Sequence, residues 1–222
     1  MIERIISYVS IFIALLIVLP LHEFAHAFAA VKSGDNTPKV YGRYTINPFA
    51  HFDLVGLAFF VLARFGWAKP VPINPKKFKN YRRGCFFTAI AGVTMNYIIA
   101  FIAYPLLILV LTKIPDIGYF DDFIKNIFYY TYSLSISFCV FNLLPIYPLD
   151  GFRIFALFSS GRSLIYKVLR YYGKYILMVW LFCGILSDFT GIYKLNFLGN
   201  TITYLSNIFA KPITLLWNAI LI

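Results

Sequence analysis

The chain has 222 residues, of which 60% are hydrophobic, 20% aromatic and only 13% charged. An average soluble domain is about half apolar and a quarter charged, so this composition excludes an ordinary soluble protein and predicts an integral membrane protein in a lipid bilayer. The formal net charge is +11, but the basic residues lie in short loops between apolar segments. Their position indicates a topological signal rather than a nucleic-acid-binding surface, and no nucleic acid partner is expected.

Five segments are apolar and long enough to cross a bilayer, since a transmembrane helix takes about 20 residues. They are residues 5–31, 86–111, 123–144, 164–186 and 201–222. Lys167, Arg170 and Lys174 crowd the first turns of the fourth segment, and Lys211-Pro212 in the fifth could mark a kinked or interfacial helix. We therefore expect an all-α polytopic membrane protein with about five transmembrane helices.

The stretch between the first two spans predicts more than a plain loop. Residues 40–46 are rich in strand-type side chains, and the prolines of residues 68–75 favour extended backbone, so a short β-hairpin-like segment is expected. Residues 52–67 are apolar but interrupted by two charged residues and two glycines, which predicts a re-entrant element rather than a crossing. No repeat or linker divides the chain, and we expect one domain over residues 1–222.

Loop charge predicts the orientation in the membrane. Residues 67–83 and 153–174 carry lysines and arginines but no acid, whereas residues 113–122 carry three aspartates. Because basic loops stay in the cytoplasm, the acidic loop is expected outside, with the N-terminus outside and the C-terminus inside. A full crossing by residues 52–67 is the competing topology.

His22 and His26 lie four residues apart in an apolar segment, so on a helix they share a face and can hold one metal ion. Glu23 lies beside them and can act on a water at that metal. An ionisable cluster is costly to bury in a membrane-length segment and therefore suggests function. The alternative is a chance match of a short pattern. Two of the three histidines of the chain fall in this pattern, which favours the metal.

A catalytic zinc takes three protein ligands, so a third must come from elsewhere. Glu23 is one of only two glutamates, so the third ligand is an aspartate or His51, or is missing. Asp150 has the most suitable context, because prolines break the helix before it and Gly151 permits a tight backbone. The alternative is that Asp150 caps the next helix. His51 with Asp53 could orient a ligand or bind metal, although a helix start or an interfacial hydrogen bond is favoured.

Two motifs together resemble those of the site-2 protease family, the intramembrane zinc metalloproteases. The histidine-glutamate-x-x-histidine helix is at residues 22–26, and the asparagine-x-x-proline-x-x-proline-leucine-aspartate-glycine motif is at residues 142–151. Residues 91–96 resemble the middle element of the family, with Val93 in place of the usual proline. The extended stretches on either side of residues 52–67 are similar to the small bacterial and archaeal branch, which lacks PDZ and CBS domains.

The resemblance covers roughly residues 15–155. It implies a catalytic core over residues 5–155 and C-terminal helices over residues 156–222. The implied activity is that of a multi-pass endopeptidase of the cytoplasmic membrane, which cleaves transmembrane protein substrates near the cytoplasmic side of the bilayer. One alternative is a membrane metal-ion transporter, but no second ligand-bearing helix is evident beyond Asp150. A non-proteolytic scaffold is another, and the intact Glu23 argues against it.

The family also implies one Zn²⁺ per chain, with Glu23 as the catalytic base. The implied protein ligands are His22, His26 and Asp150. Asn142 is expected to stabilise the oxyanion of the transition state, because the family motif has an asparagine there, and Asn96 is the second candidate. For both asparagines the alternative is a hydrogen bond between helices. A substrate helix must unfold to be cut, and residues 40–46 could hold the extended segment by edge pairing.

Overall fold

The computed structural model describes residues 1–53, 56, 68–115 and 118–221, and these are predominantly helical. The first half contains α1 (Ile2–Lys32), α2 (Thr37–Val40), α3 (Pro48–His51), the 3₁₀ turn η1 (Pro75–Lys77) and α5 (Tyr81–Lys113). The second half contains α6 (Tyr119–Leu143), α7 (Asp150–Phe158), α8 (Leu164–Tyr171), α9 (Gly173–Thr190), η2 (Tyr193–Leu195) and α10 (Phe197–Leu221). The helical class predicted from the sequence is confirmed for the described residues.

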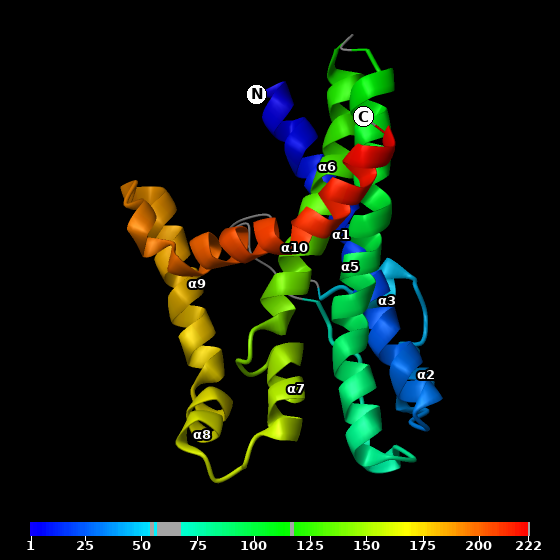
Figure 1. Cartoon of the computed structure of the whole chain (residues 1–222), viewed down its shortest axis with the longest axis vertical. Helices are drawn as coiled ribbons and strands as arrows, with labels where there is room; N and C mark the ends of the chain where they lie inside the picture. The colour runs from blue at the N-terminus through cyan, green and yellow to red at the C-terminus, as the bar shows by residue number, and fades with distance from the viewer. Residues whose placement is uncertain (54–55, 57–67, 116–117, 222) are drawn as a thin grey trace.

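Three long helices, α1, α5 and α6, pack against one another and form the centre of the molecule (Figure 1). Their contacts use small side chains, which let helices approach closely; Ala14, Ala27, Ala89 and Ala100 are fully buried. Large apolar side chains are found both in the core, as Ile136 of α6 is, and on the outer surface, as Ile102 of α5 is. Close contacts through small residues, with large apolar side chains exposed on the outside, are the arrangement expected of helices surrounded by lipid.

By length and composition, α1, α5 and α9 are the described helices that could cross a membrane. The predicted count of five is therefore not confirmed. The fourth predicted segment is also wrong as a single span, because the chain forms two helices there, α8 and α9, which meet at Tyr172. The basic residues Lys167 and Arg170 lie in the short α8, whereas Lys174 lies in the first turn of α9, whose remaining residues are largely apolar. The basic, exposed α8 and the more apolar α9 are therefore two distinct helices.

The predicted strand at residues 40–46 is wrong. Thr37–Val40 is a helical turn with Pro38 in its first turn, and turns and bends follow it. The side chain of Asp35 accepts a hydrogen bond from Thr37 N at 2.9 Å, which starts the turn as an N-terminal cap does. This local hydrogen bonding outweighs the strand preference of Val40 and its neighbours, since β-propensity depends on a partner strand.

The predicted extended backbone of residues 68–75 is found over residues 69–74, before the turn η1. Phe52 forms an isolated antiparallel bridge with Ala68, and Lys69 N donates to His51 O at 2.7 Å. Within the described residues this bridge is the only β-type pairing. The predicted re-entrant element lies almost wholly outside the described residues.

Asp35 anchors the far end of this extended segment, a contact that no pattern in the sequence indicated. The Asp35 side chain is fully buried and accepts a hydrogen bond from Asn74 N at 2.6 Å, besides those from Thr37. Burial alone would raise the pKa of Asp35, but these hydrogen bonds and nearby Lys77 outweigh burial and lower the pKa. The ionised Asp35 therefore stabilises the fold at neutral pH, and this stabilisation is lost as the pH falls through the lowered pKa.

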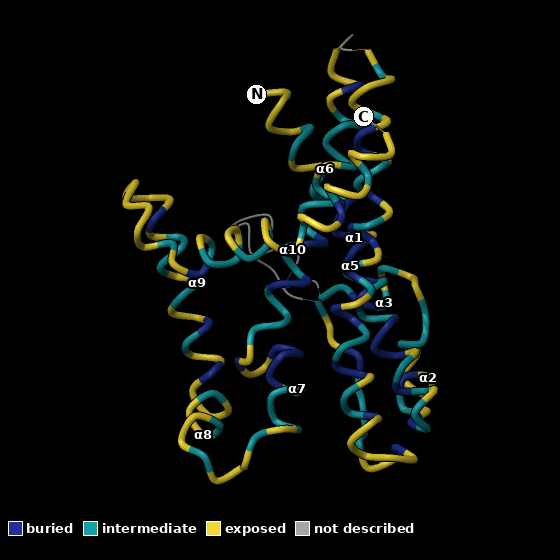
Figure 2. Tube along the Cα trace, in the orientation of Figure 1, coloured by how far each residue is buried: buried dark blue, intermediate teal, exposed yellow. Residues whose placement is uncertain are grey.

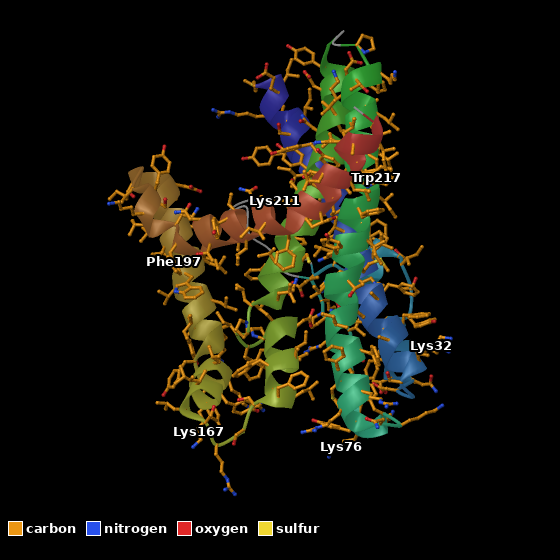
Figure 3. All side chains as sticks on the ribbon, in the orientation of Figure 1. Lys32, Lys76, Lys167, Phe197, Lys211 and Trp217 are labelled. Atoms are coloured by element: carbon orange, nitrogen blue, oxygen red, sulfur yellow. The ribbon has the colours of Figure 1, made fainter. Side chains whose placement is uncertain are left out.

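The C-terminal helices extend from the bundle and return to it (Figures 1 and 2). Helices α8 and α9 are largely exposed, and α10 crosses back to pack against α5 and α6. Ile213 of α10 is buried against Ala100 and Ile136, and the Trp217 ring lies 5.3 Å from that of Phe101. Pro212 lies inside α10, which continues beyond it. Figure 3 shows Trp217 on this returning end of α10, with Lys211 near the middle of the helix.

Candidate metal centre

The structure brings His22, His26 and Asp150 together at the meeting of α1, α5 and α7. His26 Nε2 lies 3.0 Å from His22 Nε2 and 2.9 Å from Asp150 Oδ2, and His22 Nε2 lies 3.4 Å from the same oxygen. All three residues are buried, with exposed fractions of 6%, 4% and 6% in chain order. They form the one such cluster of potential metal ligands among the described residues. Neither His51 nor Asp53 belongs to it.

The proton on His26 can be placed from its hydrogen bond. His26 Nδ1 lies 2.7 Å from Thr88 O, and a carbonyl oxygen can only accept, so Nδ1 carries the proton. In the neutral ring Nε2 then keeps its lone pair, and it is Nε2 that faces His22 and Asp150. A second partner that fixes the tautomer in this way is typical of metal-binding histidines.

The donor set fits a zinc ion. Two nitrogens at 2.0–2.1 Å from a tetrahedral zinc lie about 3.3 Å apart, close to the separations between the three facing atoms. Asp150 Oδ2 is buried and has no hydrogen-bond partner among the described residues. Such an orphaned carboxylate oxygen between two imidazole nitrogens is costly unless a cation lies among them.

Gly92 of α5 makes the room for this cluster. A Cβ added there would overlap His26 Nε2 and lie 2.7 Å from His22 Nε2. No side chain fits at that position while the two rings keep their places, so glycine lets α5 lie directly against the metal-facing side of α1. The sequence comparison with the middle family element included this glycine but did not indicate its contact.

Asp150 reaches the histidines because the chain breaks between α6 and α7. Leu144–Leu149 is non-helical, and Asp150 is the first residue of α7. A Cβ at Gly151 would collide with Leu143 O, so the start of α7 packs closely on the end of α6. Arg153, one turn further, lies 3.6 Å from Asp150 Oδ1, which leaves Oδ2 for the histidines. The expected role of the proline-rich break is supported by this geometry.

Glu23 is held by the extended segment that follows the bridge. Its Oε2 accepts a hydrogen bond from Val71 N at 3.0 Å, and both residues line the cavity around the ligand cluster, whose volume is about 120 Å³. Residues 69–74 are thus attached at Glu23 and at Asp35 and form one wall of the site. Sequence reasoning missed this contact because a backbone amide leaves no signature in the side-chain pattern.

The two candidate asparagines lie in different environments. Asn142 lines the metal cavity, and its Nδ2 donates to Phe138 O at 3.1 Å within α6; one N–H of the amide remains for another acceptor. Asn96 is fully buried one turn beyond Gly92, does not line this cavity, and neither amide atom has a described hydrogen-bond partner. His51 is buried away from the ligands, where Nε2 lies 2.8 Å from Thr45 O, in accord with the favoured hydrogen-bonding role.

We predict that Gly92→Ala weakens zinc binding by about 10- to 100-fold, as loss of an orienting contact does. The new methyl group would push the His22 and His26 rings apart, although alanine favours the helix by about 1 kcal/mol over glycine. Zinc affinity by competition with a chromophoric chelator gives the measurement, and Gly161→Ala, where a Cβ meets open space, is the control. Equal affinity in both variants would contradict the tight packing against Gly92.

The sequence profile described as "Peptidase family M50" matches residues 10–184. The chain therefore belongs to peptidase family M50, which confirms the predicted site-2 protease family. A Bacillus subtilis (strain 168) protein named "Putative zinc metalloprotease YwhC" is 40% identical over 143 residues, which cover 64% of this chain and 65% of that protein. "Putative zinc metalloprotease Rip2" of Mycolicibacterium smegmatis (strain ATCC 700084 / mc(2)155) is 32% identical over 161 residues, which cover 67% of this chain and 58% of that protein.

The chain therefore spans 65% and 58% of the lengths of these two relatives. No solved structure matches it with statistical significance.

Proposed function

We propose that the chain is a zinc-dependent endopeptidase that cleaves transmembrane protein substrates within the bilayer. The observation that carries the proposal is the convergence of Asp150 of α7 with His22 and His26 beside Glu23. The two histidines and Glu23 lie on α1, a helix long and apolar enough to cross a membrane. The names of the two relatives agree with a zinc metalloprotease. We assign the two histidines and Asp150 as the ligands of one Zn²⁺ per chain.

Bound zinc would supply a Lewis acid that activates water and polarises the scissile carbonyl. Glu23 takes a proton from the attacking water and returns it to the leaving amine. Its present bond to Val71 N holds the carboxylate at the wall of the cavity. Asn142 lines the same cavity and has an N–H free to donate to the developing oxyanion. Asn96 does not line this cavity, so we assign the contact with the oxyanion to Asn142 rather than to Asn96.

A direct test uses the purified protein, loaded with zinc, and synthetic single-span peptides in detergent micelles. Mass spectrometry of the products should show cleavage inside the apolar segment, and removal of zinc by a chelator should stop it. Cleavage confined to soluble peptides would contradict an intramembrane substrate. Metal-dependent uptake into vesicles, with no peptide cut, would instead support the transporter alternative.

We further propose that the site lies toward the cytoplasmic face of the cytoplasmic membrane. Lys32, Lys76 and Lys167 come from separate parts of the chain and lie toward the same end of the molecule (Figure 3), and clustered basic residues favour the cytoplasm. His22 lies ten residues before Lys32, about 15 Å along the helix. This depth supports a position of the ligand pair in the inner half of the bilayer.

This orientation predicts the labelling of single cysteines in a variant without Cys85, Cys139 and Cys183. A cysteine at Ser33 or Asn80 should resist an impermeant thiol reagent added outside intact cells, and a cysteine at Asp116 should react. Labelling after the cells are opened controls for buried thiols. Reaction of the Ser33 site from outside would mean that residues 52–67 cross the membrane, and the proposed orientation would be wrong.

A further inference from the structure

A second and larger cavity adjoins the metal site. Its volume is about 580 Å³, within the range of roughly 300–1,000 Å³ of ligand-binding pockets. It is lined by residues 71–82, the first half of α5, α7 and α8; Figure 1 shows α7 between α8 and this half of α5. Val71, Ile73 and Arg153 line both cavities, so a ligand can extend from one into the other.

Three arginines line this second cavity, which we call the arginine cavity: Arg82 of α5, Arg153 of α7 and Arg170 of α8. No aspartate or glutamate is among the described residues of its lining. Arg153 lines both cavities and forms an ion pair with Asp150. Neither Arg82 nor Arg170 forms an ion pair with a carboxylate in the described part of the chain. The cavity therefore carries positive charge that its own lining does not balance.

The remaining walls are largely aromatic and apolar. The ring of Phe152 lies 5.8 Å from that of Tyr147 and 5.6 Å from that of Tyr166, and Phe78 closes the side toward η1. Arg82, Arg153 and Arg170 are all exposed to solvent, so the attraction of each one to an anion is modest, and the three together supply the positive charge of the cavity. The planar guanidinium matches a carboxylate in two parallel hydrogen bonds.

We propose that the arginine cavity is a specificity subsite that binds an aspartate or glutamate side chain of the substrate, a few residues from the scissile bond. The proposal rests on the proposed function of the metal site. Continuity with the metal cavity favours a peptide over a lipid headgroup, because an extended chain lying past Glu23 and Val71 enters the arginine cavity directly. The aromatic walls then contact the neighbouring side chains of the same peptide.

This subsite would exclude most membrane proteins. Transmembrane segments commonly carry lysine or arginine at their cytoplasmic ends, and such a residue would meet Arg82, Arg153 and Arg170 with like charge. A substrate with an acidic residue at that place would be accepted. Selection of this kind acts through repulsion of the wrong substrate as much as through attraction of the right one.

The experiment measures the binding of labelled single-span peptides to the full chain carrying Glu23→Gln, in nanodiscs of zwitterionic lipid. Glutamate, glutamine or lysine is placed in turn at each position three to six residues on either side of the expected cut. At one position or more the glutamate peptide should bind about fivefold more tightly than the glutamine peptide, and the lysine peptide should bind more weakly. The same ranking should hold for kcat/KM with the zinc-loaded wild type.

Arg82→Gln and Arg170→Gln, together, should remove the preference for glutamate and leave the affinity for the glutamine peptide unchanged. Arg83→Gln and Lys167→Gln are the matched controls, because these basic residues are exposed as Arg82 and Arg170 are, and neighbour them, but do not line the cavity. Arg153 is left intact, since it contacts Asp150. Equal binding of the glutamate and glutamine peptides at every position, or a preference that survives the double variant, would overturn the proposal.

Nanodiscs with anionic phosphatidylglycerol test the lipid as occupant. If binding shows no preference for glutamate, and Arg82→Gln with Arg170→Gln lowers the retention of phosphatidylglycerol, the cavity binds a lipid phosphate and the peptide proposal is wrong. The proposed function has a separate readout. A wild type that binds the glutamate peptide selectively but cuts no peptide would contradict the protease assignment and leave the subsite established.

Discussion

Glu23→Gln is expected to abolish peptide cleavage, with a loss of about 10²- to 10⁴-fold in kcat, the range that general acid–base catalysis contributes. Glutamine has nearly the shape of glutamate but cannot take a proton from water at neutral pH. Its side-chain oxygen can still accept the hydrogen bond from Val71 N, so the wall formed by residues 69–74 should stay in place. The measurement is the rate of cleavage of a single-span peptide by the purified variant.

The matched control is Glu3→Gln, because Glu3 is the other glutamate of the chain and lies exposed in the first turn of α1. It should cleave at the wild-type rate. Zinc content and melting temperature of Glu23→Gln should equal those of the wild type, which separates loss of chemistry from loss of the site. Cleavage within a few-fold of wild type would assign the proton transfer to another group and contradict the mechanism.

Asp150→Ala should remove bound zinc, since two histidines alone cannot complete a three-ligand site. We expect zinc affinity to fall by more than about 100-fold, which exceeds the loss that removal of an outer contact causes. Metal analysis of the purified variant gives the measurement. Thermal unfolding gives a second one: a chelator should lower the melting temperature of the wild type, because zinc stabilises only the folded chain, and should leave that of Asp150→Ala unchanged.

Asp53→Ala and His51→Ala test the other ligands that the sequence left open. Both should keep one zinc per chain, because neither residue belongs to the cluster around Asp150. His51→Ala should lower stability instead, since it removes the contact with Thr45 O. Full zinc retention in Asp150→Ala, together with loss in either control, would identify a different third ligand.

Local features of the site could be predicted from the sequence. The pairing of His22 with His26 depends only on helical periodicity, which places residues four apart on one face. The extended backbone at residues 69–74 follows from its prolines, which act within one or two residues. The break before Asp150 follows from prolines as well. The prediction of a strand at residues 40–46 was wrong because strand propensity takes effect only beside a partner strand. The hydrogen bonds of Asp35 stabilise a helical turn at the start of this stretch instead.

The sequence by itself determined the helical class, the family and the residue types at the metal centre, because these depend on composition, short spacings and local backbone preference. The sequence also favoured Asp150 as the third ligand. Only the tertiary structure decided that Oδ2 of Asp150 faces both histidines, that Gly92 makes room for their rings, and that Val71 N holds Glu23. The same holds for the arginine cavity, whose lining comes from segments as distant as Arg82 and Arg170. Contacts between residues far apart in the chain depend on how the helices pack, and no local pattern records that packing.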